Sequence, residues 1–187
     1  MTTNLSKLKR LNIGGIKMSY TNRYGQPQGF AKLDTNKLRE ILIAEIIAIN
    51  GYAEHIANSN MKDINKAWNS IMGDEKKHYG MILTLLRKYD PNQYKSYKEH
   101  IGDKSGPKSP MQEFTPNYNK QVILNNIRED IKGEFEAVIL YEQMLAIIPY
   151  PDVRYAIFSI INEEKGHAEH LTQLLLKYDS DKYNGLE

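Results

Sequence analysis

The chain carries one pattern twice, and the two copies lie 89 residues apart. The aligned pairs, all found without a gap, are Arg39-Glu40 with Arg128-Glu129, Glu45 with Glu134, Ala48 with Ala137, Tyr52 with Tyr141, Asp63 with Asp152, Ala67 with Ala156, Glu75-Lys76 with Glu164-Lys165, His78 with His167, Leu85-Leu86 with Leu174-Leu175, and Lys88-Tyr89-Asp90 with Lys177-Tyr178-Asp179. A self-alignment of this length predicts that the chain folds as two copies of one structural unit.

The repeating unit has the spacing of a helical hairpin. Apolar residues recur with a helical period from residue 38 to 56, and the segment "NSNM" at 58–61 interrupts them. The sequence therefore predicts four long helices, over residues 34–57, 63–89, 121–147 and 152–179. Asp34 or Thr35, Asp63 and Asp152 are expected as N-caps.

These helices divide the chain into an irregular N-terminal arm (1–33), a helical domain (34–179) and a C-terminal tail (180–187). Within the domain, the first hairpin spans 34–90 and the second spans 121–179. The connection over 91–120 is polar, with four prolines and two glycines. Because such a long connection is unusual in a compact domain, we expect it to cross the length of the molecule or to be functional.

Composition excludes several kinds of site. The chain has no cysteine, which removes disulfides, thiolate metal sites and cysteine nucleophiles. Its net charge is +2 and its basic residues are scattered, so we expect no nucleic-acid partner. No apolar run is long enough to span a bilayer and no secretory signal is present, so we expect a cytoplasmic protein without a membrane partner.

Each half also carries a Glu followed thirty residues later by Glu-x-x-His. Residues three apart share one face of a helix, so the Glu and the His of each Glu-x-x-His point the same way. The first Glu and the Glu-x-x-His are also about equally far from the turn, so they lie level with each other across the hairpin. Two facing hairpins would then bring six side chains together: Glu45, Glu75, His78, Glu134, Glu164 and His167.

Four buried carboxylates cannot remain unpaired at one depth, because desolvation and mutual repulsion are too costly. Two divalent cations would resolve this, and carboxylate and imidazole ligands suit iron or manganese. The sequence thus predicts two metal ions, and two iron ions, two manganese ions or a mixed Mn/Fe pair would all accept these ligands. The opposing interpretation is a solvated charged face, but Glu45 lies within the apolar run "ILIAEIIAI", where such a face is hard to place.

The pattern "EIIAINGY…DEKKH" with "EFEAVILY…NEEKGH" resembles the ferritin-like di-iron carboxylate superfamily, and the rubrerythrin branch most closely. The resemblance implies an all-α, ferritin-like four-helix bundle with a long crossover over 91–120. It also implies that Glu45 and Glu134 are terminal ligands, that Glu75 and Glu164 bridge, and that His78 and His167 complete the two metals. Rubrerythrins usually add a rubredoxin iron site with four cysteines, and they place a further Glu where this chain has Ala137.

Further residues lie close to this ligand pattern in the sequence. Tyr52 and Tyr141 follow the terminal Glu residues by two helical turns, so each is expected to hydrogen-bond a ligand carboxylate and could take part in the redox chemistry. The alternative is a core tyrosine with a satisfied hydroxyl. His55 is expected at the surface, and Asp74 and Glu163 are expected to face solvent or a neighbouring helix.

The resemblance implies an oxidoreductase of the rubrerythrin-like type that detoxifies peroxide by reducing hydrogen peroxide or dioxygen. A separate electron donor protein would re-reduce it. Two alternatives remain: a ferroxidase or iron-storage-type protein that oxidises Fe(II), and a metal-binding bundle without turnover. We also expect a homodimer.

Overall fold

The computed structural model describes residues 31–100, 115–179 and 183, and these residues form five α-helices and no strand. The sequence-based prediction of an all-α bundle is therefore confirmed. Most of the arm (1–30), residues 101–114 of the connection and most of the tail (180–182 and 184–187) lie outside the described residues. Among the helices described, none combines the length and the apolar character that crossing a membrane requires.

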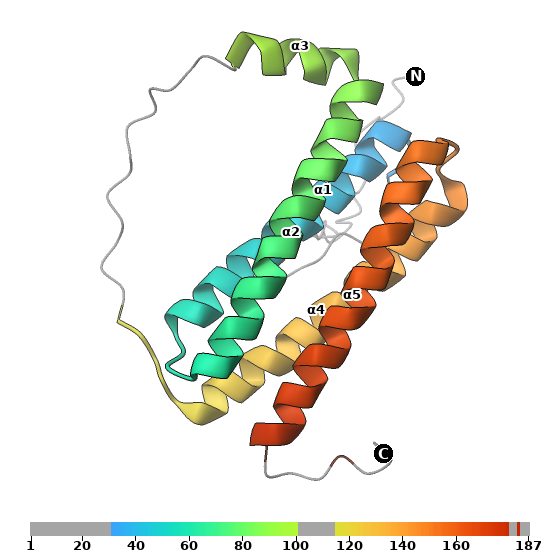
Figure 1. Ribbon diagram of the computed structural model, residues 1–187. Coiled ribbons are helices and arrows are strands. Elements are labelled where there is room, and N and C mark those ends of the chain that lie inside the picture. Colours follow the sequence, from blue (N-terminus) through green and yellow to red (C-terminus); the bar gives the residue numbers. More distant parts are fainter. Residues whose placement is uncertain (1–30, 101–114, 180–182, 184–187) are drawn as a thin grey trace, which may run out of the picture.

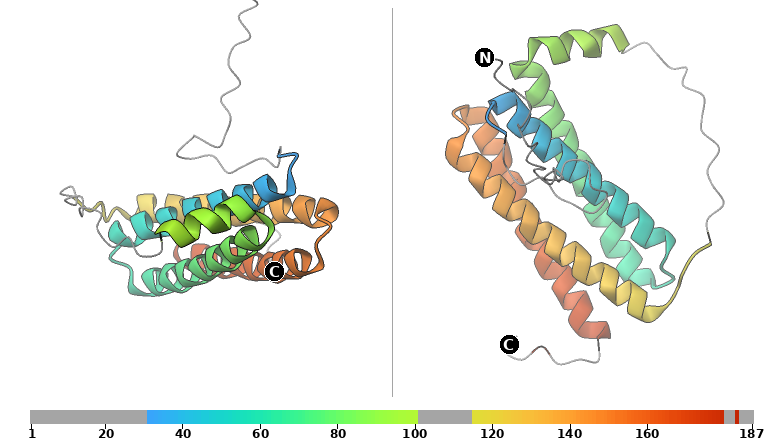
Figure 2. Two further views of the ribbon diagram at one scale, coloured as in Figure 1. Left: turned by 90° about the horizontal axis from the view of Figure 1, so that it is seen from above. Right: turned by 180° about the vertical axis from the view of Figure 1, so that it is seen from behind.

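The four long helices form two layers (Figures 1 and 2). α1 (Asp34–Ala57) packs along α2 (Lys62–Tyr89), and α4 (Lys120–Ile147) packs along α5 (Pro151–Tyr178). The two pairs then meet through α1 against α4 and α2 against α5. In Figure 1, α2 and α4 run in one direction while α1 and α5 run in the other.

The core follows the apolar stripe of each helix. In α1 the buried positions include Leu38, Ile41, Glu45 and Tyr52, which follow one another at spacings of three, four and seven residues. Their spacing places them on one side of the helix, so Glu45 occupies a core position. Two apolar clusters fill the bundle, one around Ile41, Leu86, Val138, Met144 and Ile157 and the other around Ile64, Trp68, Ile127, Leu171 and Leu175.

The helices begin slightly earlier than the predicted caps. The N-cap residues of α1, α2 and α5 are Leu33, Met61 and Tyr150, and none of them makes a side-chain cap hydrogen bond. The expected caps Asp34, Asp63 and Asp152 instead lie in the first turns, where a carboxylate still interacts favourably with the helix dipole.

Asp63 and Asp152 also join the two hairpins. Lys177 Nζ lies 2.6 Å from Asp63 Oδ2, and the hydroxyl of Tyr178 donates to the same carboxylate. Asp152 makes the equivalent contacts, since it accepts hydrogen bonds from Lys88 at 2.7 Å and from Tyr89 at 2.6 Å. Two of the repeated sequence elements thus fasten the ends of α2 and α5 to each other.

The third residue of each repeated Lys-Tyr-Asp triplet acts within its own hairpin. Asp90 pairs with Arg39, and Asp179 pairs with Arg128. In both hairpins, a carboxylate at the end of the second helix therefore holds the arginine near the start of the first.

The connection between the hairpins contains a short helix that the sequence did not predict. Its first ten residues form α3 (Pro91–His100), which turns aside from the end of α2 (Figure 1). At this end of the bundle, Gln93 accepts a hydrogen bond from Arg39, near the start of α1. Asn117 lies at the opposite end, where its backbone N–H donates to Asn58 just after α1. The connection therefore joins opposite ends of the bundle.

Candidate metal centre

The bundle brings all six predicted ligands together between the two apolar clusters. One comes from α1, two from α2, one from α4 and two from α5: Glu45, Glu75, His78, Glu134, Glu164 and His167. All six are buried. Their nitrogen and carboxylate oxygen atoms form two groups, each with all its ligand atoms within 4.8 Å of one another. Glu75 and Glu164 belong to both groups.

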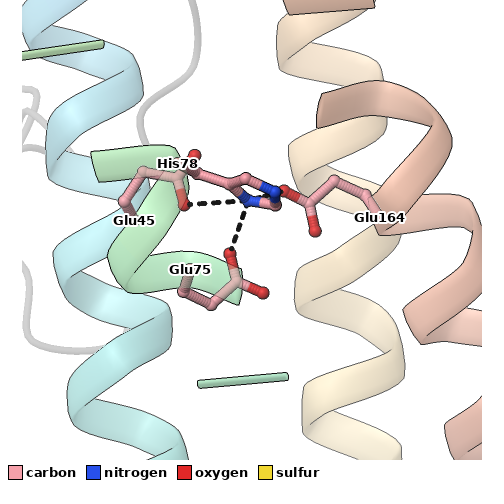
Figure 3. Close-up of side chains that lie close together, drawn as sticks. All are labelled: Glu45, Glu75, His78 and Glu164. Carbon is pink, nitrogen blue, oxygen red and sulfur yellow. Dashed lines mark hydrogen bonds and ion pairs between the residues drawn. The ribbon is translucent and has the colours of Figure 1, made fainter. Parts of the chain in front are cut away.

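The two shared carboxylates lie between the imidazoles. Glu75 turns Oε2 toward His78 Nδ1 at 3.3 Å and Oε1 toward His167 Nδ1 at 3.2 Å. Glu164 does the same, with Oε1 at 3.3 Å from His78 Nδ1 and Oε2 at 3.1 Å from His167 Nδ1. Figure 3 shows His78 with three of the carboxylates around it. Each shared carboxylate therefore offers one oxygen to each half of the centre.

The other two carboxylates each face a single imidazole. Glu45 Oε2 lies 3.7 Å from His78 Nδ1, and Glu134 Oε2 lies 3.5 Å from His167 Nδ1. A tyrosine from the other hairpin holds the remaining oxygen. Tyr141 donates to Glu45 Oε1 at 2.7 Å, and Tyr52 donates to Glu134 Oε1. The expected tyrosine contact is present, although each phenol reaches the carboxylate of the opposite hairpin.

The outer nitrogen of each imidazole faces an acid that the sequence did not assign to the site. His78 Nε2 lies 3.2 Å from Glu163 Oε2, and His167 Nε2 lies 3.6 Å from Asp74 Oδ2. These contacts cross between α2 and α5. The repeat could have indicated both acids, because it places an acidic residue directly before each of the shared Glu residues.

Burial and ion pairing shift the pKa values of the clustered side chains in different directions. Burial raises the pKa of Glu45 to about 8 and raises that of Glu134, although His78 and His167 oppose these shifts. Burial would also raise the pKa of Glu75, but pairing with His167 and His78 outweighs it and lowers that pKa to about 2. Desolvation would lower the pKa of both imidazoles, yet the surrounding carboxylates raise both. Without cations, these shifts favour a proton on Glu45, on Glu134 and on both imidazoles.

The unsatisfied oxygens of the cluster fit bound cations. Each Nδ1 can donate to only one oxygen, and the Oε2 atoms of Glu75 and Glu164 accept these two hydrogen bonds. Glu45 Oε2, Glu75 Oε1 and Glu164 Oε1 are fully buried and accept no hydrogen bond from the part of the chain that the structure describes, although the last two lie 3.2 and 3.3 Å from an imidazole Nδ1. A buried acceptor without a partner is costly, and a metal ion satisfies it. The donor set of four carboxylates and two imidazoles suits iron or manganese.

A groove of about 1030 Å³ reaches the cluster from the α1–α4 side, which faces the viewer in the right panel of Figure 2. All four carboxylates line it, together with Tyr52 and Tyr141. Neither His78 nor His167 is among the described residues that line it. The centre thus has a carboxylate side that borders the groove and an imidazole side that faces α2 and α5.

The prediction that His55 is a surface residue is wrong. His55 Nδ1 lies 2.9 Å from Asp130 Oδ1, and the His55 ring is 5.5 Å from that of the buried Trp68. Burial raises the pKa of Asp130, which the pairing with His55 opposes. The equivalent positions in the other half are the buried apolar residues Met144, Ile41 and Ile157. The two halves therefore share their ligands but differ in what surrounds them.

No family model matches the sequence, and no curated protein matches it. Among solved structures, the chain is similar to a hypothetical protein from Pyrococcus furiosus, with a TM-score of 0.60 and 19% sequence identity. The match covers 80% of this chain and 94% of that one. At this level of identity, the likeness extends to the fold alone.

Proposed function

We propose that this chain is a ferritin-like, rubrerythrin-like oxidoreductase that reduces hydrogen peroxide or dioxygen at a carboxylate-bridged pair of iron ions. The observation that carries the proposal is the position of Glu75 and Glu164, each of which points one oxygen at His78 and the other at His167. A carboxylate that served one ion, or that only paired with a histidine, would not need to face both.

The remaining ligands divide between two positions. Glu45 and His78 would hold one ion, Glu134 and His167 would hold the other, and the shared carboxylates would lie between. When bound, the two ions supply electrons and Lewis acidity for the reduction. Manganese at one or both positions would use the same ligands.

The surrounding residues fix this frame. Tyr52 and Tyr141 each hold one oxygen of a terminal carboxylate, which leaves the other oxygen directed at the centre. Glu163 and Asp74 face the outer nitrogens of the imidazoles, so that they favour Nε2–H and keep Nδ1 free as a ligand atom. The two apolar clusters on either side of the centre limit the access of water to it through the bundle core.

One observation favours a second function, a ferroxidase for which Fe²⁺ is the substrate and leaves as Fe³⁺. Acidic side chains line much of the groove that leads to the centre, as an entry path for cations requires. The two functions differ in whether iron stays in the protein during turnover.

The test uses the full chain loaded anaerobically with Fe²⁺ and mixed rapidly with hydrogen peroxide or dioxygen. Faster oxidation by peroxide, with two irons per chain that can be re-reduced repeatedly, supports the peroxidase. Continued consumption of added Fe²⁺ beyond two per chain supports the ferroxidase. Bound iron that neither oxidant changes would leave only a metal-binding bundle, and failure to bind iron would overturn the proposal as a whole. Glu169→Ala, an exposed change on α5, is the control.

A further inference from the structure

The groove between α1 and α4 combines apolar side chains with many carboxylates. The four carboxylates of the centre line it. Further carboxyl and carboxamide side chains also line it: Glu54, Glu129, Asp130, Glu136, Asn50, Asn58, Asn117 and Asn126. Oxygen ligands of this kind suit hydrated divalent cations.

The charge of the groove favours cations. Lys132 is the one lysine or arginine among the described residues that line it. Its Nζ lies 3.5 Å from Glu129 and 3.6 Å from Glu136, so a single positive charge faces two acids there. A cleft with a net negative lining raises the local concentration of cations and their rate of association.

A second, independent feature lies at the inner end. Glu45 is 1% exposed, and its Oε2 makes no hydrogen bond to a described residue. Glu75 Oε1 and Glu164 Oε1 also accept no hydrogen bond from a described residue, although each faces an imidazole Nδ1, at 3.2 and 3.3 Å. These three residues line the groove, so acceptor atoms that need a partner lie where an entering cation would arrive.

We propose that the α1–α4 groove is the route by which hydrated divalent cations enter the centre, an inference that rests on the proposed function. Cations would meet the four carboxylates first and the imidazoles last, because both histidines lie on the side that faces α2 and α5. The α2–α5 face is the alternative route, and there ion pairs from Lys77 and His78 to Glu163 cover the site.

Two glycines allow the route to be blocked. Gly51 and Gly133 lie on opposite walls of the groove, and a Cβ built on either meets no atom of the described residues within 4 Å. Each is in a helix interior, where glycine is less favourable than a residue with a side chain. Phenylalanine at both positions would therefore fill the groove without a backbone cost. Gly80 on α2 is equally open but does not line the groove, so Gly80→Phe is the matched control.

The experiment mixes metal-free full-length protein with Co²⁺ and follows the visible absorption that appears on coordination. We expect the double variant Gly51→Phe/Gly133→Phe to bind two Co²⁺ at equilibrium, as the wild type does, but to load about tenfold more slowly, since entry then waits for an opening motion. Gly80→Phe should load at the wild-type rate. An unchanged rate in the double variant would overturn the route.

Variants that change the charge at the groove test the same route without introducing bulky residues. Lys132→Glu should speed loading severalfold at low ionic strength, and salt should abolish the gain. Lys76→Glu, the same charge change on the exposed side of α2, should have little effect. Equal acceleration by both variants would contradict a route through the groove. If wild-type protein takes up no Co²⁺, the proposed function fails first, and the two failures are thereby distinguished.

Discussion

At the scale of single residues, two acids adjacent in sequence make different contacts, because a helix turns by about 100° per residue. Glu164 is 1% exposed and faces both imidazoles, whereas the preceding Glu163 points across to the outer nitrogen of His78. Glu75 and Asp74 are arranged in the same way around His167. Each acidic pair therefore supplies one carboxylate inside the cluster and one behind the facing histidine.

The outer acids are expected to tune metal affinity. Glu163→Gln should weaken the ion held by His78, and Asp74→Asn should weaken the ion held by His167, each by about tenfold to a hundredfold, because the ring loses the negative charge that holds its Nε2–H and makes Nδ1 a stronger ligand. Co²⁺ titration with resolved first and second binding steps measures this. Equal weakening of both ions by either variant would contradict the assignment of one acid to each histidine.

The shared carboxylates give a sharper expectation. Glu75→Ala should weaken both ions, because both oxygens of Glu75 point into the centre, one toward each half. His78→Ala and His167→Ala should each weaken chiefly one ion. Metal stoichiometry and affinity are measured by titration, with the exposed Glu169→Ala as the control. Two ions bound by Glu75→Ala with wild-type affinity would rule out the bridging role.

At the scale of helices, the ends of α2 and α5 are held by repeated ion pairs. Hydrogen bonds from Lys177 and Tyr178 lower the pKa of Asp63 to about 2, and those from Lys88 and Tyr89 do the same for Asp152. Such a carboxyl group stabilises the fold above its unfolded-state pKa, and this contribution is lost as the pH falls through the folded-state value.

We therefore expect Asp63→Asn/Asp152→Asn to melt at a lower temperature than the wild type near neutral pH. The difference should shrink between about pH 4 and pH 2, as the wild-type carboxyl groups become protonated. Thermal melts across this range measure it, with Glu169→Gln as the control. A difference that stays constant over the whole range would show that the two pairs act through packing rather than charge.

The long helices could be predicted from sequence and α3 could not, for a physical reason. The long helices each bury a stripe of residues, so their apolar spacing is visible in the chain. α3 buries no residue, and it rests on contacts such as Arg87 over the ring of Tyr97, 3.8 Å from its centroid. A helix without a buried face leaves no hydrophobic period to detect.

The repeat likewise predicted only part of the centre and its surroundings. It predicted the six side chains that come together, because every one of them occurs in both halves. It could not predict the pair of His55 and Asp130, because the other half has Met144 and Ile41 at these positions. A comparison of the two halves detects only features that both halves contain, so it misses a pair that occurs in one half.

At the scale of the whole molecule, the charged cluster forms a layer between two apolar clusters, and the hydrogen bonds across it come from both hairpins. Tyr52 on α1 reaches Glu134 on α4, and Tyr141 on α4 reaches Glu45 on α1. Each terminal carboxylate is thus held only when both hairpins are in place. Assembly of the bundle and assembly of the centre are therefore the same event, and a ligand of the centre stabilises the whole fold.

Removing metal should accordingly lower the stability of the entire domain. A ligand that binds the folded chain alone stabilises it by about 2.7 kcal/mol at a hundred times its Kd, and for a chain of this size that corresponds to a Tm shift of roughly 5–10 °C. The metal-free protein should remain folded, since protons on the two imidazoles and on Glu45 and Glu134 offset part of the charge. Calorimetry of the chelated and the metal-loaded chain measures the shift.

Glu75→Ala supplies the internal comparison. With one shared carboxylate removed, added metal should raise its Tm by less than that of the wild type, whereas the shift in Glu169→Ala should match the wild type. A wild-type Tm that metal leaves unchanged would mean that the six converging side chains bind no cation. The three buried oxygens of Glu45, Glu75 and Glu164 would then still need a partner of another kind.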